Sequence, residues 1–230
     1  MAQVRGLFVT FEGVDGCGKS TQVARLAQRL KAQGYPVLCL REPGGTPLSE
    51  KIRSLLLDPA NGDMVPQAEL LLYEASRAQL VCQVIRPALD AGHVVLCDRF
   101  YDSTTAYQRA GRGLDAALVS QANHLGSCGL TPDLTLWLQL DPAQGLARAV
   151  GAHCPDRLEQ EGVAFQEAVA AGFAAIAQAE PQRVVPVDAS GTPEQVESAI
   201  YRVVSRVMAT HGVAPASTAD PAASRGAARD

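Results

Sequence analysis

The stretch Phe11-Glu-Gly-Val-Asp-Gly-Cys-Gly-Lys-Ser-Thr21 decides how the chain is read. An apolar run typical of a buried parallel strand precedes it, and apolar residues at helical spacing follow it. Gly13-x-x-x-x-Gly18-Lys19-Ser20 therefore matches the phosphate-binding P-loop pattern in the strand–loop–helix context that the pattern requires. Backbone N–H groups of such a loop, together with the N-terminus of the next helix, bind phosphate oxygens. The pattern predicts that Lys19 contacts the β- and γ-phosphates and that the Ser20 hydroxyl binds Mg²⁺.

The alternative is a glycine-rich turn that binds nothing, which neither the spacing nor the flanking elements favour. We expect the phosphates of ATP to lie along the whole loop. The expected ATP-binding residues are Gly13, Val14, Asp15, Gly16, Cys17, Gly18, Lys19, Ser20 and Thr21.

The composition fits a single globular domain in a reducing compartment. The chain has 230 residues, of which 47% are hydrophobic, and this is enough for a full core. A formal net charge of −4 argues against non-specific binding to nucleic acid or to an anionic membrane. No apolar run reaches transmembrane length, and the N-terminus lacks the pattern of a signal peptide. The six cysteines form no C-x-x-C pair and mostly have apolar neighbours, so we expect reduced thiols in a cytoplasmic protein.

Apolar runs alternate with helical patterns along the chain, as in proteins with a parallel α/β sheet. Such sheets bind ligands at the carboxyl ends of their strands, where Glu12, Arg41, Asp98 and Arg99 fall. This pattern predicts an α/β P-loop NTPase fold with a five-stranded parallel sheet flanked by helices. The expected strands are residues 7–12, 36–41, 93–98, 134–140 and 184–187, and the expected helices are residues 20–33, 47–57, 66–91, 116–125, 142–150, 159–179 and 193–210.

Two segments depart from this alternation. Residues 151–156 interrupt two helical patterns, and we interpret them as part of a mobile flap. From Gly212 onward Ala, Pro, Ser and Gly dominate without apolar periodicity, so residues 212–230 are expected to form a disordered tail. Residues 1–211 are then one P-loop domain, with the flap at about residues 148–158.

Charged residues near the loop are candidates for chemistry. Asp98 ends an apolar run, which is the place of a Walker-B carboxylate near Mg²⁺, and Arg99 would face a phosphate. The alternative is a surface ion pair after a strand. Asp15 is interpreted as an acceptor for a substrate hydroxyl or for a water on Mg²⁺. A solvent-facing loop position is its alternative, because the pattern leaves this site free.

A second set of residues suits a planar, phosphorylated partner. Tyr73 and Arg77 are four residues apart on an expected helix, so they should project from one face. A ring beside a guanidinium can stack on a base and donate hydrogen bonds to its carbonyl. On a leucine-rich helix, however, a tyrosine is more often part of the core. The alternative for Arg53 is a solvated charge on a helix. The polar segment 102–108 supplies hydroxyls and amides that a hydrophobic core does not need, so a purely structural role is improbable for it.

Together these segments resemble the bacterial thymidylate kinases, which transfer the γ-phosphoryl group of ATP to dTMP. The resemblance runs from about residue 7 to residue 210. Many proteins share the P-loop, but the combination of Glu-Pro-Gly-Gly-Thr, Asp-Arg-x-x-x-Ser and Ala-Tyr-Gln is far more specific to this family. The matching motifs are Phe11-Glu-Gly-Val-Asp-Gly-x-Gly-Lys-Ser-Thr21, Arg41-Glu-Pro-Gly-Gly-Thr46, Ile52-Arg-Ser-Leu-Leu-Leu57, Ala75-Ser-Arg-Ala-Gln-Leu80, Asp98-Arg-Phe-Tyr-x-Ser103, Ala106-Tyr-Gln108, Gly111-Arg-Gly113 and Asp156-Arg-Leu-Glu159.

The resemblance implies phosphorylation of dTMP to dTDP by in-line transfer from ATP, with Mg²⁺ as the cofactor and ATP and dTMP as the small-molecule partners. Ser20 and Asp98 would hold the Mg²⁺, partly through water. Family members are commonly homodimers through packed helices, for which residues 66–91 are a candidate. The dTMP-binding residues that it implies are Asp15, Arg53, Tyr73, Arg77, Arg99, Ser103, Thr104, Tyr107 and Gln108.

Individual roles follow from the same resemblance. Tyr73 takes the place of the aromatic residue that stacks on thymine, and Arg77 the place of the residue that reads O4. Arg53 and Arg99 would hold the dTMP phosphate. Thr104 would lie near the N3 edge of the base, and Tyr107 would crowd the 2′ position and favour deoxyribose. Residues 187–192 match the loop that contacts adenine.

The chain departs from the family in its flap, which the family calls the LID. Some members carry a catalytic arginine in the P-loop and others bring it from the LID; Gly16 here implies the second arrangement. Yet the LID lacks the usual Arg-x-Arg-x-Arg run, because Val150 and Ala152 occupy two of those places. Arg148 and Arg157 remain as candidates. The catalytic set implied is Asp15, Lys19, Arg99, Arg148 and Arg157.

Two other functions remain open at this point, and the presence of Lys19, Ser20 and Asp98 argues against a third, a nucleotide-binding module without catalytic activity. The first is a P-loop kinase that acts on another nucleoside monophosphate or on a deoxynucleoside. The second is a P-loop switch or motor ATPase, which would need a water-orienting residue and a partner surface. The spare arginines favour a second phosphate as the ligand instead.

Overall fold

The computed structural model describes residues 6–150 and 156–215. The middle of the expected flap, residues 151–155, and most of the expected tail, residues 216–230, lie outside the described residues. The last helix ends at His211, and Gly212 follows it in the left-handed conformation that favours glycine.

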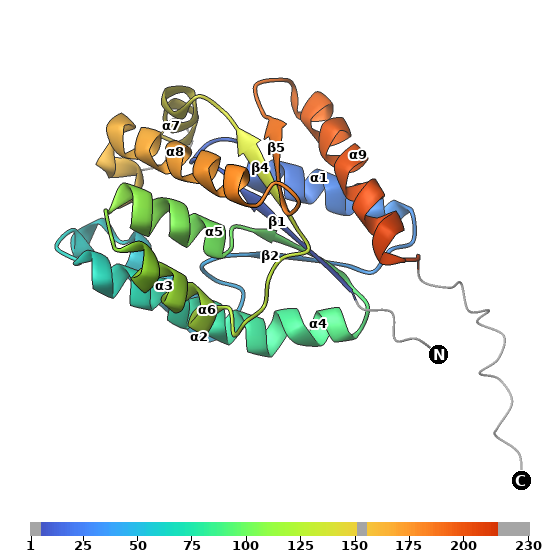
Figure 1. Ribbon diagram of the computed structural model, residues 1–230, viewed down its shortest axis with the longest axis horizontal. Coiled ribbons are helices and arrows are strands. Elements are labelled where there is room, and N and C mark those ends of the chain that lie inside the picture. Colours follow the sequence, from blue (N-terminus) through green and yellow to red (C-terminus); the bar gives the residue numbers. More distant parts are fainter. Residues whose placement is uncertain (1–5, 151–155, 216–230) are drawn as a thin grey trace, which may run out of the picture.

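Five parallel strands form one sheet in the order β2-β3-β1-β4-β5, which confirms the fold class expected from the sequence (Figure 1). Every residue of the central strand β1 is buried. Its register with β3 places Phe11 opposite Asp98, so that the P-loop begins beside the end of β3. The strands are β1 (Leu7–Glu12), β2 (Val37–Arg41), β3 (Val94–Asp98), β4 (Leu134–Gln139) and β5 (Val184–Asp188).

Helices cover both faces of the sheet (Figure 1). Helices α1 and α9 pack against each other, α3 packs against both α2 and α6, and α8 packs against η3. The helices are α1 (Lys19–Ala32), α2 (Pro47–Leu57), α3 (Pro66–Leu80), α4 (Arg86–Asp90), α5 (Tyr101–Thr104), α6 (Ala116–Gly126), α7 (Pro142–Val150), α8 (Val163–Ala179) and α9 (Pro193–His211), with short 3₁₀ or π segments η1 (Pro59–Asn61), η2 (Val81–Ile85), η3 (Thr105–Gly111) and η4 (Glu159–Glu161).

The core is divided by the alternation of side chains along the strands. Leu7, Val9 and Phe11 of β1 belong to a cluster that includes buried residues of α1 and α9. Phe8 points the other way and packs with buried residues of α3, η2 and α4. Among the described helices none is long and apolar enough to span a bilayer.

Three differences from the expected elements have physical causes. The expected helix 66–91 contains the π segment η2, just before Pro87, which has no N–H with which to continue an α-helical ladder. The expected helix 159–179 starts later, at Val163, because Gly162 has φ of +83° and separates it from η4.

The third difference is the polar segment 102–108 after β3, which is not among the expected helices. It forms the helical segments α5 and η3. Helix α8 packs tightly on η3, and a Cβ on Gly172 would lie 2.9 Å from the Cβ of Ala110. Small residues on both sides permit this approach, so packing rather than local propensity determines the structure here.

Candidate active site

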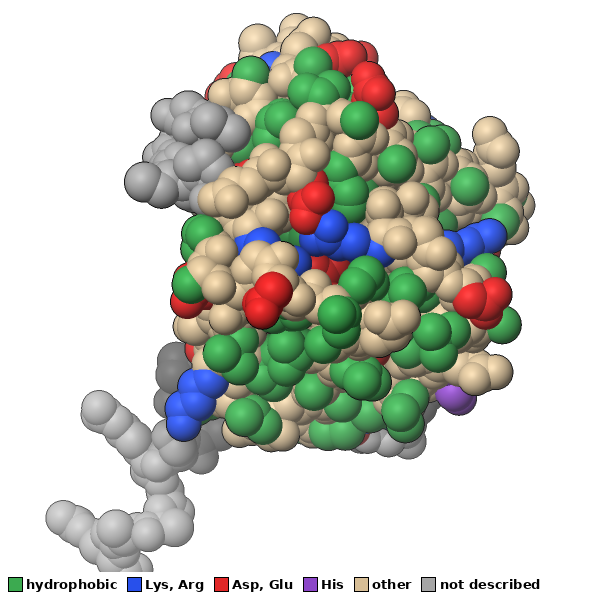
Figure 2. Space-filling view, turned by 90° about the vertical axis from the view of Figure 1, so that its left-hand side faces the viewer, with side chains coloured by type: hydrophobic (Ala, Val, Ile, Leu, Met, Phe, Trp, Pro, Cys, Tyr) green, Lys and Arg blue, Asp and Glu red, His purple; other side chains and the backbone are tan. Residues whose placement is uncertain are grey.

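A cavity of about 500 Å³ lies at the carboxyl ends of the strands. Figure 2 shows that edge face-on, with Lys and Arg side chains and interspersed acidic ones gathered across the middle of the face. Most of the residues that the sequence singled out line this cavity. They are Asp15, Gly16, Gly18, Lys19, Ser20, Thr21, Arg53, Tyr73, Asp98, Arg99, Ser103, Thr104, Tyr107, Gln108 and Arg148.

Five expected site residues do not line the cavity: Gly13, Val14, Cys17, Arg77 and Arg157. Gly13 and Val14 nevertheless contribute their carbonyl groups to the loop. The Lys19 ammonium donates hydrogen bonds to the Val14 oxygen at 2.9 Å and to the Gly13 oxygen at 3.1 Å. Lys19 thus lies buried within the curve of the loop.

The N-terminus of α1 is suited to bind an anion. Its N-cap residue is Gly18, with φ of +96°, and no side chain caps the helix. The first N–H groups of a helix have no partner within the helix, so those of α1 are available to phosphate oxygens.

Ser20 and Asp98 provide a pair of hard oxygen ligands. The Ser20 hydroxyl donates a hydrogen bond of 2.5 Å to Asp98 Oδ2. Within the described residues there is no cluster of three or more His, Cys, Asp or Glu side chains that could hold a metal. This small donor set fits Mg²⁺, which usually takes one or two protein ligands and completes its shell with water and substrate phosphates.

Helix α7 approaches the P-loop at two glycines. A Cβ on Gly16 would lie 2.0 Å from the Gly145 carbonyl oxygen, and a Cβ on Gly145 would lie 2.5 Å from the Asp15 carbonyl oxygen. Gly16 also has φ of +71°. This contact brings Arg148, one turn further along α7, to the wall of the cavity.

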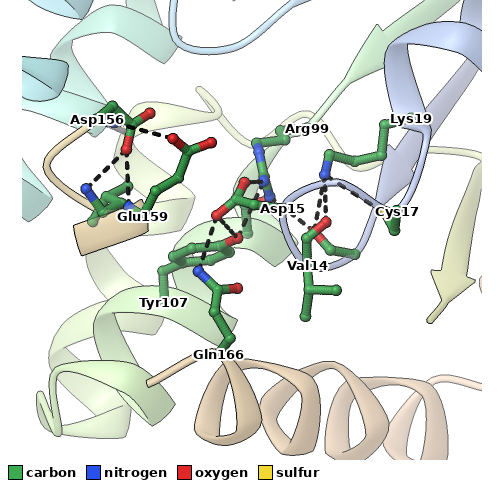
Figure 3. Close-up of polar contacts among 12 residues, drawn as sticks. Val14, Asp15, Cys17, Lys19, Arg99, Tyr107, Asp156, Glu159 and Gln166 are labelled. Carbon is green, nitrogen blue, oxygen red and sulfur yellow. Dashed lines mark hydrogen bonds and ion pairs between the residues drawn. The ribbon is translucent and has the colours of Figure 1, made fainter. Parts of the chain in front are cut away.

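Asp15 is the centre of a polar network (Figure 3). Arg99 Nη2 contacts its Oδ1, while the Tyr107 hydroxyl and the Gln166 amide each donate to Oδ2 at 3.0 Å. Burial alone would raise the pKa of Asp15, but Arg99 and Lys19 more than offset it and lower the pKa. Asp15 is therefore an anion that is held in place from three sides. Sequence reasoning missed Gln166, which lies on the alanine-rich helix α8 with no motif around it.

The position of Arg99 is fixed by β1. Arg99 has φ of +71°, which is unusual for a residue with a side chain. Its Nη1 donates to the Gly13 oxygen at 3.1 Å and to Ser103 Oγ at 3.0 Å. Glu12 accepts hydrogen bonds from the Phe100 N–H at 2.7 Å and from Ser103 Oγ at 2.5 Å. Glu12, for which sequence analysis predicted no individual role, thus orients the turn that carries Arg99.

Tyr73 and Arg77 do not project together, and this corrects our expectation. Tyr73 lines the cavity, whereas Arg77 is 1% exposed and does not line it. The guanidinium of Arg77 donates to Glu42 at 2.8 Å, to Glu74 at 2.6 Å and to Thr104 Oγ1 at 2.9 Å. Arg77 therefore lies behind the cavity and positions Thr104 in its wall.

Arg53 lines the cavity next to the turn after β2. Its Nη1 donates to the Pro43 carbonyl oxygen at 3.1 Å, which holds the side chain against the turn after β2. Burial, together with the nearby charge of Arg41, lowers the pKa of Arg53. Arg41 itself is paired with Glu50 at 2.9 Å.

Arg157, which we expected to take part in the reaction, does not line the cavity in this structure. It is 5% exposed, and Nη2 lies 2.5 Å from Glu69 Oε2. Its Nε donates to the Leu56 carbonyl oxygen at 2.9 Å. Glu69, which sequence reasoning missed, also accepts hydrogen bonds from Gln108 and Arg112. Arg157 thus fastens the C-terminal end of the LID to α2 and α3, and Arg148 is left as the LID candidate that lines the cavity.

Of two further cavities, one borders the P-loop and the other lies apart from the expected site residues. One of about 310 Å³ is lined by Val14 of the P-loop and by Asp188 and Ser190 at the end of β5. A larger one of about 750 Å³ lies among α5, η3, α6 and α8, and no expected site residue lines it.

The fold and the loop define a P-loop nucleotide-binding protein whose phosphate site faces a second, arginine-lined region. The sequence model of the family described as thymidylate kinase matches residues 11–200. The chain belongs to the thymidylate kinase family, whose members phosphorylate dTMP to dTDP. The resemblance inferred from the motifs is thereby confirmed.

Individual relatives support the same family. The chain is 54% identical to a thymidylate kinase of Synechococcus sp. (strain JA-2-3B'a(2-13)) over 86% of the chain and 94% of the relative. It is 52% identical to a thymidylate kinase of Deinococcus radiodurans, over 87% of the chain and 97% of the relative. Among solved structures, the thymidylate kinase of Ehrlichia chaffeensis superimposes with a TM-score of 0.72 at 32% identity, covering 87% of this chain and 99% of that one.

Proposed function

We propose that this protein phosphorylates dTMP to dTDP, using ATP as the donor and Mg²⁺ as the cofactor. The observation that carries the proposal is that Lys19 and Ser20 of the P-loop share one cavity with Arg53, Tyr73 and Arg99. A donor and an acceptor nucleotide can then lie with their phosphates facing each other. A site for hydrolysis alone has no use for the second, basic region.

The donor half follows from the loop. The N–H groups at the start of α1 and the Lys19 ammonium bind the β- and γ-phosphates. Ser20 and Asp98 hold Mg²⁺, which neutralises charge on the β- and γ-oxygens when it is bound. Adenine takes the hollow between Val14 and Ser190, which agrees with the expected role of residues 187–192.

The acceptor half is built from the opposite wall. Arg53 and Arg99 hold the dTMP phosphate, and the Tyr73 ring stacks on the thymine. Thr104, held by Arg77, faces the N3 edge of the base. Ser103 and Gln108 complete the wall.

The sugar lies between these groups. Tyr107 restricts the space at the 2′ position, and Asp15 accepts a hydrogen bond from the 3′-hydroxyl. The hydroxyl of Tyr107 already donates to Asp15, so the two residues act as one unit.

The chemistry needs position and charge rather than a covalent intermediate. An oxygen of the dTMP phosphate attacks the γ-phosphorus of ATP. The bond between the γ-phosphorus and the oxygen that bridges the β- and γ-phosphates breaks, and the products are dTDP and ADP. Arg53 and Arg99 offset the repulsion between the two anions, which aligns the reactants before the reaction. Lys19 and Arg148 stabilise the charge on the transferring group.

We also propose an oligomeric state, a domain organisation and a cellular compartment for the enzyme. A homodimer through the layer of α2, α3 and α6 is supported by exposed leucines on these neighbouring helices: Leu55, Leu71, Leu118 and Leu125. Residues 1–211 act as one domain, with residues 148–158 as the LID. We place the enzyme in the cytoplasm, where its substrates and Mg²⁺ are available.

A phosphotransfer assay across acceptors tests the function. The panel is dTMP, dUMP, dCMP, dGMP, UMP, thymidine and no acceptor, with formation of the phosphorylated product as the readout. We expect dTMP to be the preferred acceptor and Lys19→Ala to abolish the transfer. A faster reaction with another monophosphate would identify the other kinase, and ATP hydrolysis that is equally fast without acceptor would identify a switch or motor ATPase.

A further inference from the structure

Two cysteines that are far apart in the sequence form a close thiol pair. The Sγ atoms of Cys82 and Cys128 lie 3.4 Å apart, although 46 positions separate the residues. Cys82 belongs to η2 and is exposed, and Cys128 belongs to the turn after α6 and is half-buried. Neither residue has a role in the proposed reaction, and neither lines the active-site cavity.

The backbone around the pair holds the thiols together. Cys128 and Gly129 both have positive φ, at 52° and 73°, so the chain reverses sharply after α6. Arg86 Nη2 donates to the Cys128 carbonyl oxygen, and Leu130 packs in the cluster formed by η2 and α4. The turn is thus tied to the element that carries Cys82.

The other cysteines offer no comparable pair among the described residues. Cys17 and Cys97 are buried, and Cys39 is exposed on β2 without a second sulfur beside it. Cys154 lies outside the described residues.

We propose that Cys82 and Cys128 form a reversible intramolecular disulfide when the protein meets a peroxide. The sulfurs must approach by about 1.4 Å to reach the S–S bond length of about 2.05 Å, which side-chain rotation can supply. Cys82 reacts first because it is exposed to peroxide, whereas Cys128 is half-buried and burial raises its pKa.

The reaction balances in two steps. The Cys82 thiolate attacks one oxygen of hydrogen peroxide and becomes a sulfenic acid, and hydroxide leaves. The Cys128 thiol then attacks that sulfur, and water leaves as the disulfide forms. Overall, two thiols and one peroxide give one disulfide and two waters. A dithiol such as dithiothreitol reverses the reaction by exchange.

The disulfide would join two elements that support the acceptor wall. Cys82 follows α3, the helix that carries Glu69, Tyr73 and Arg77, and Cys128 follows α6, which packs against α3. A link between them closes a loop of 46 residues in the unfolded chain and so opposes unfolding. Peroxide should therefore make the native protein more resistant to heat rather than inactivate it through unfolding.

The test treats the full-length protein with hydrogen peroxide, quenches it and maps its peptides without reduction. We expect a peptide pair linked through Cys82 and Cys128, the loss of two hydrogens in intact mass, and a melting temperature that rises by several degrees. Dithiothreitol should restore both values. Cys82→Ser and Cys128→Ser should lose the linked peptide and the rise in melting temperature, whereas Cys39→Ser is the matched control that should keep them.

Three outcomes would overturn the proposal. One is a stable sulfenic or sulfinic acid on Cys82 while Cys128 stays reduced. Another is a disulfide that joins either cysteine to a different residue or to a second chain, which a non-reducing gel would show. The third is a melting temperature that does not change although the linked peptide has formed.

Discussion

Gly16 and Gly145 meet backbone to backbone, so that a Cβ on Gly16 would lie 2.0 Å from the Gly145 carbonyl oxygen. This contact explains why the P-loop carries no arginine at that position, because any side chain there would displace α7. It also places Arg148 beside the loop that holds the donor phosphates. The same packing contact thus leaves no room for an arginine at this position of the P-loop and places Arg148 of α7 at the wall of the cavity.

Gly16→Ala should lower kcat by at least about tenfold, because a displaced α7 moves Arg148 away from the transferring group. Gly113→Ala is the matched control: Gly113 has φ of +74°, close to the +71° of Gly16, but a Cβ there meets nothing within 4 Å. Both variants carry the same backbone strain, and only the first creates a clash. Steady-state kinetics with ATP and dTMP check this, and equal losses of kcat in the two variants would contradict the packing argument.

Arg148→Ala and Arg157→Ala should have different effects. Removal of Arg148 should lower kcat by about 10³-fold with a smaller change in KM, because an arginine that stabilises the transferring phosphoryl group acts in the transition state. Removal of Arg157 leaves Glu69 with one cation fewer in a buried site and should chiefly lower the melting temperature. Kinetics and thermal unfolding of both variants distinguish these roles. A loss of kcat for Arg157→Ala in a fully stable protein would restore Arg157 to the reaction.

The sequence was sufficient for the parts of the site that depend on local pattern. Gly13 to Thr21 could be identified because the P-loop is a continuous stretch with fixed spacing. The strand ends, and with them Asp98 and Arg99, followed from the length of the apolar runs. These features need no knowledge of which elements meet in space.

The parts that failed depend on tertiary contacts. Helical spacing placed Tyr73 and Arg77 on one face, but it could not show that Glu42, just after β2, draws the guanidinium of Arg77 into the interior. Likewise, nothing local marks Glu69 as the partner of Arg157, nor Gln166 as a donor to Asp15. Sequence patterns locate charges along the chain, whereas pairing decides which of them remain free to bind a ligand.

Tyr73 and Arg77 should therefore respond differently to substitution. Tyr73→Ala should raise the KM for dTMP by about tenfold or more and leave the KM for ATP unchanged, because a stacked base is worth about 1–3 kcal/mol. Tyr73→Phe keeps the ring and should restore the affinity. Arg77→Ala should cost about 3–5 kcal/mol of folding free energy, because it leaves Glu42 and Glu74 buried without their cation. Kinetics and urea unfolding measure these effects, and an Arg77→Ala protein with normal stability and a raised KM for dTMP would show that Arg77 binds the base directly.

Glu12 should make the protein less stable as the pH rises through neutrality. Burial raises its pKa from 4.5 to about 8, and the same cause raises the pKa of Glu42 to about 7. At a pH between 4.5, the pKa in the unfolded chain, and these raised values, the folded chain keeps protons that the unfolded chain has released. The folded state then binds more protons than the unfolded state, so stability falls as the pH rises. The slope for each group is at most about 1.4 kcal/mol per pH unit.

Glu12→Gln should flatten the fall in stability between about pH 5 and 8, as measured by urea unfolding. Glu50→Gln is the control, because contacts with the Gly45 N–H and Arg41 lower the pKa of Glu50 and its loss should leave the downward slope in place. Identical slopes in the wild type and Glu12→Gln would show that Glu12 is already ionised in the folded protein.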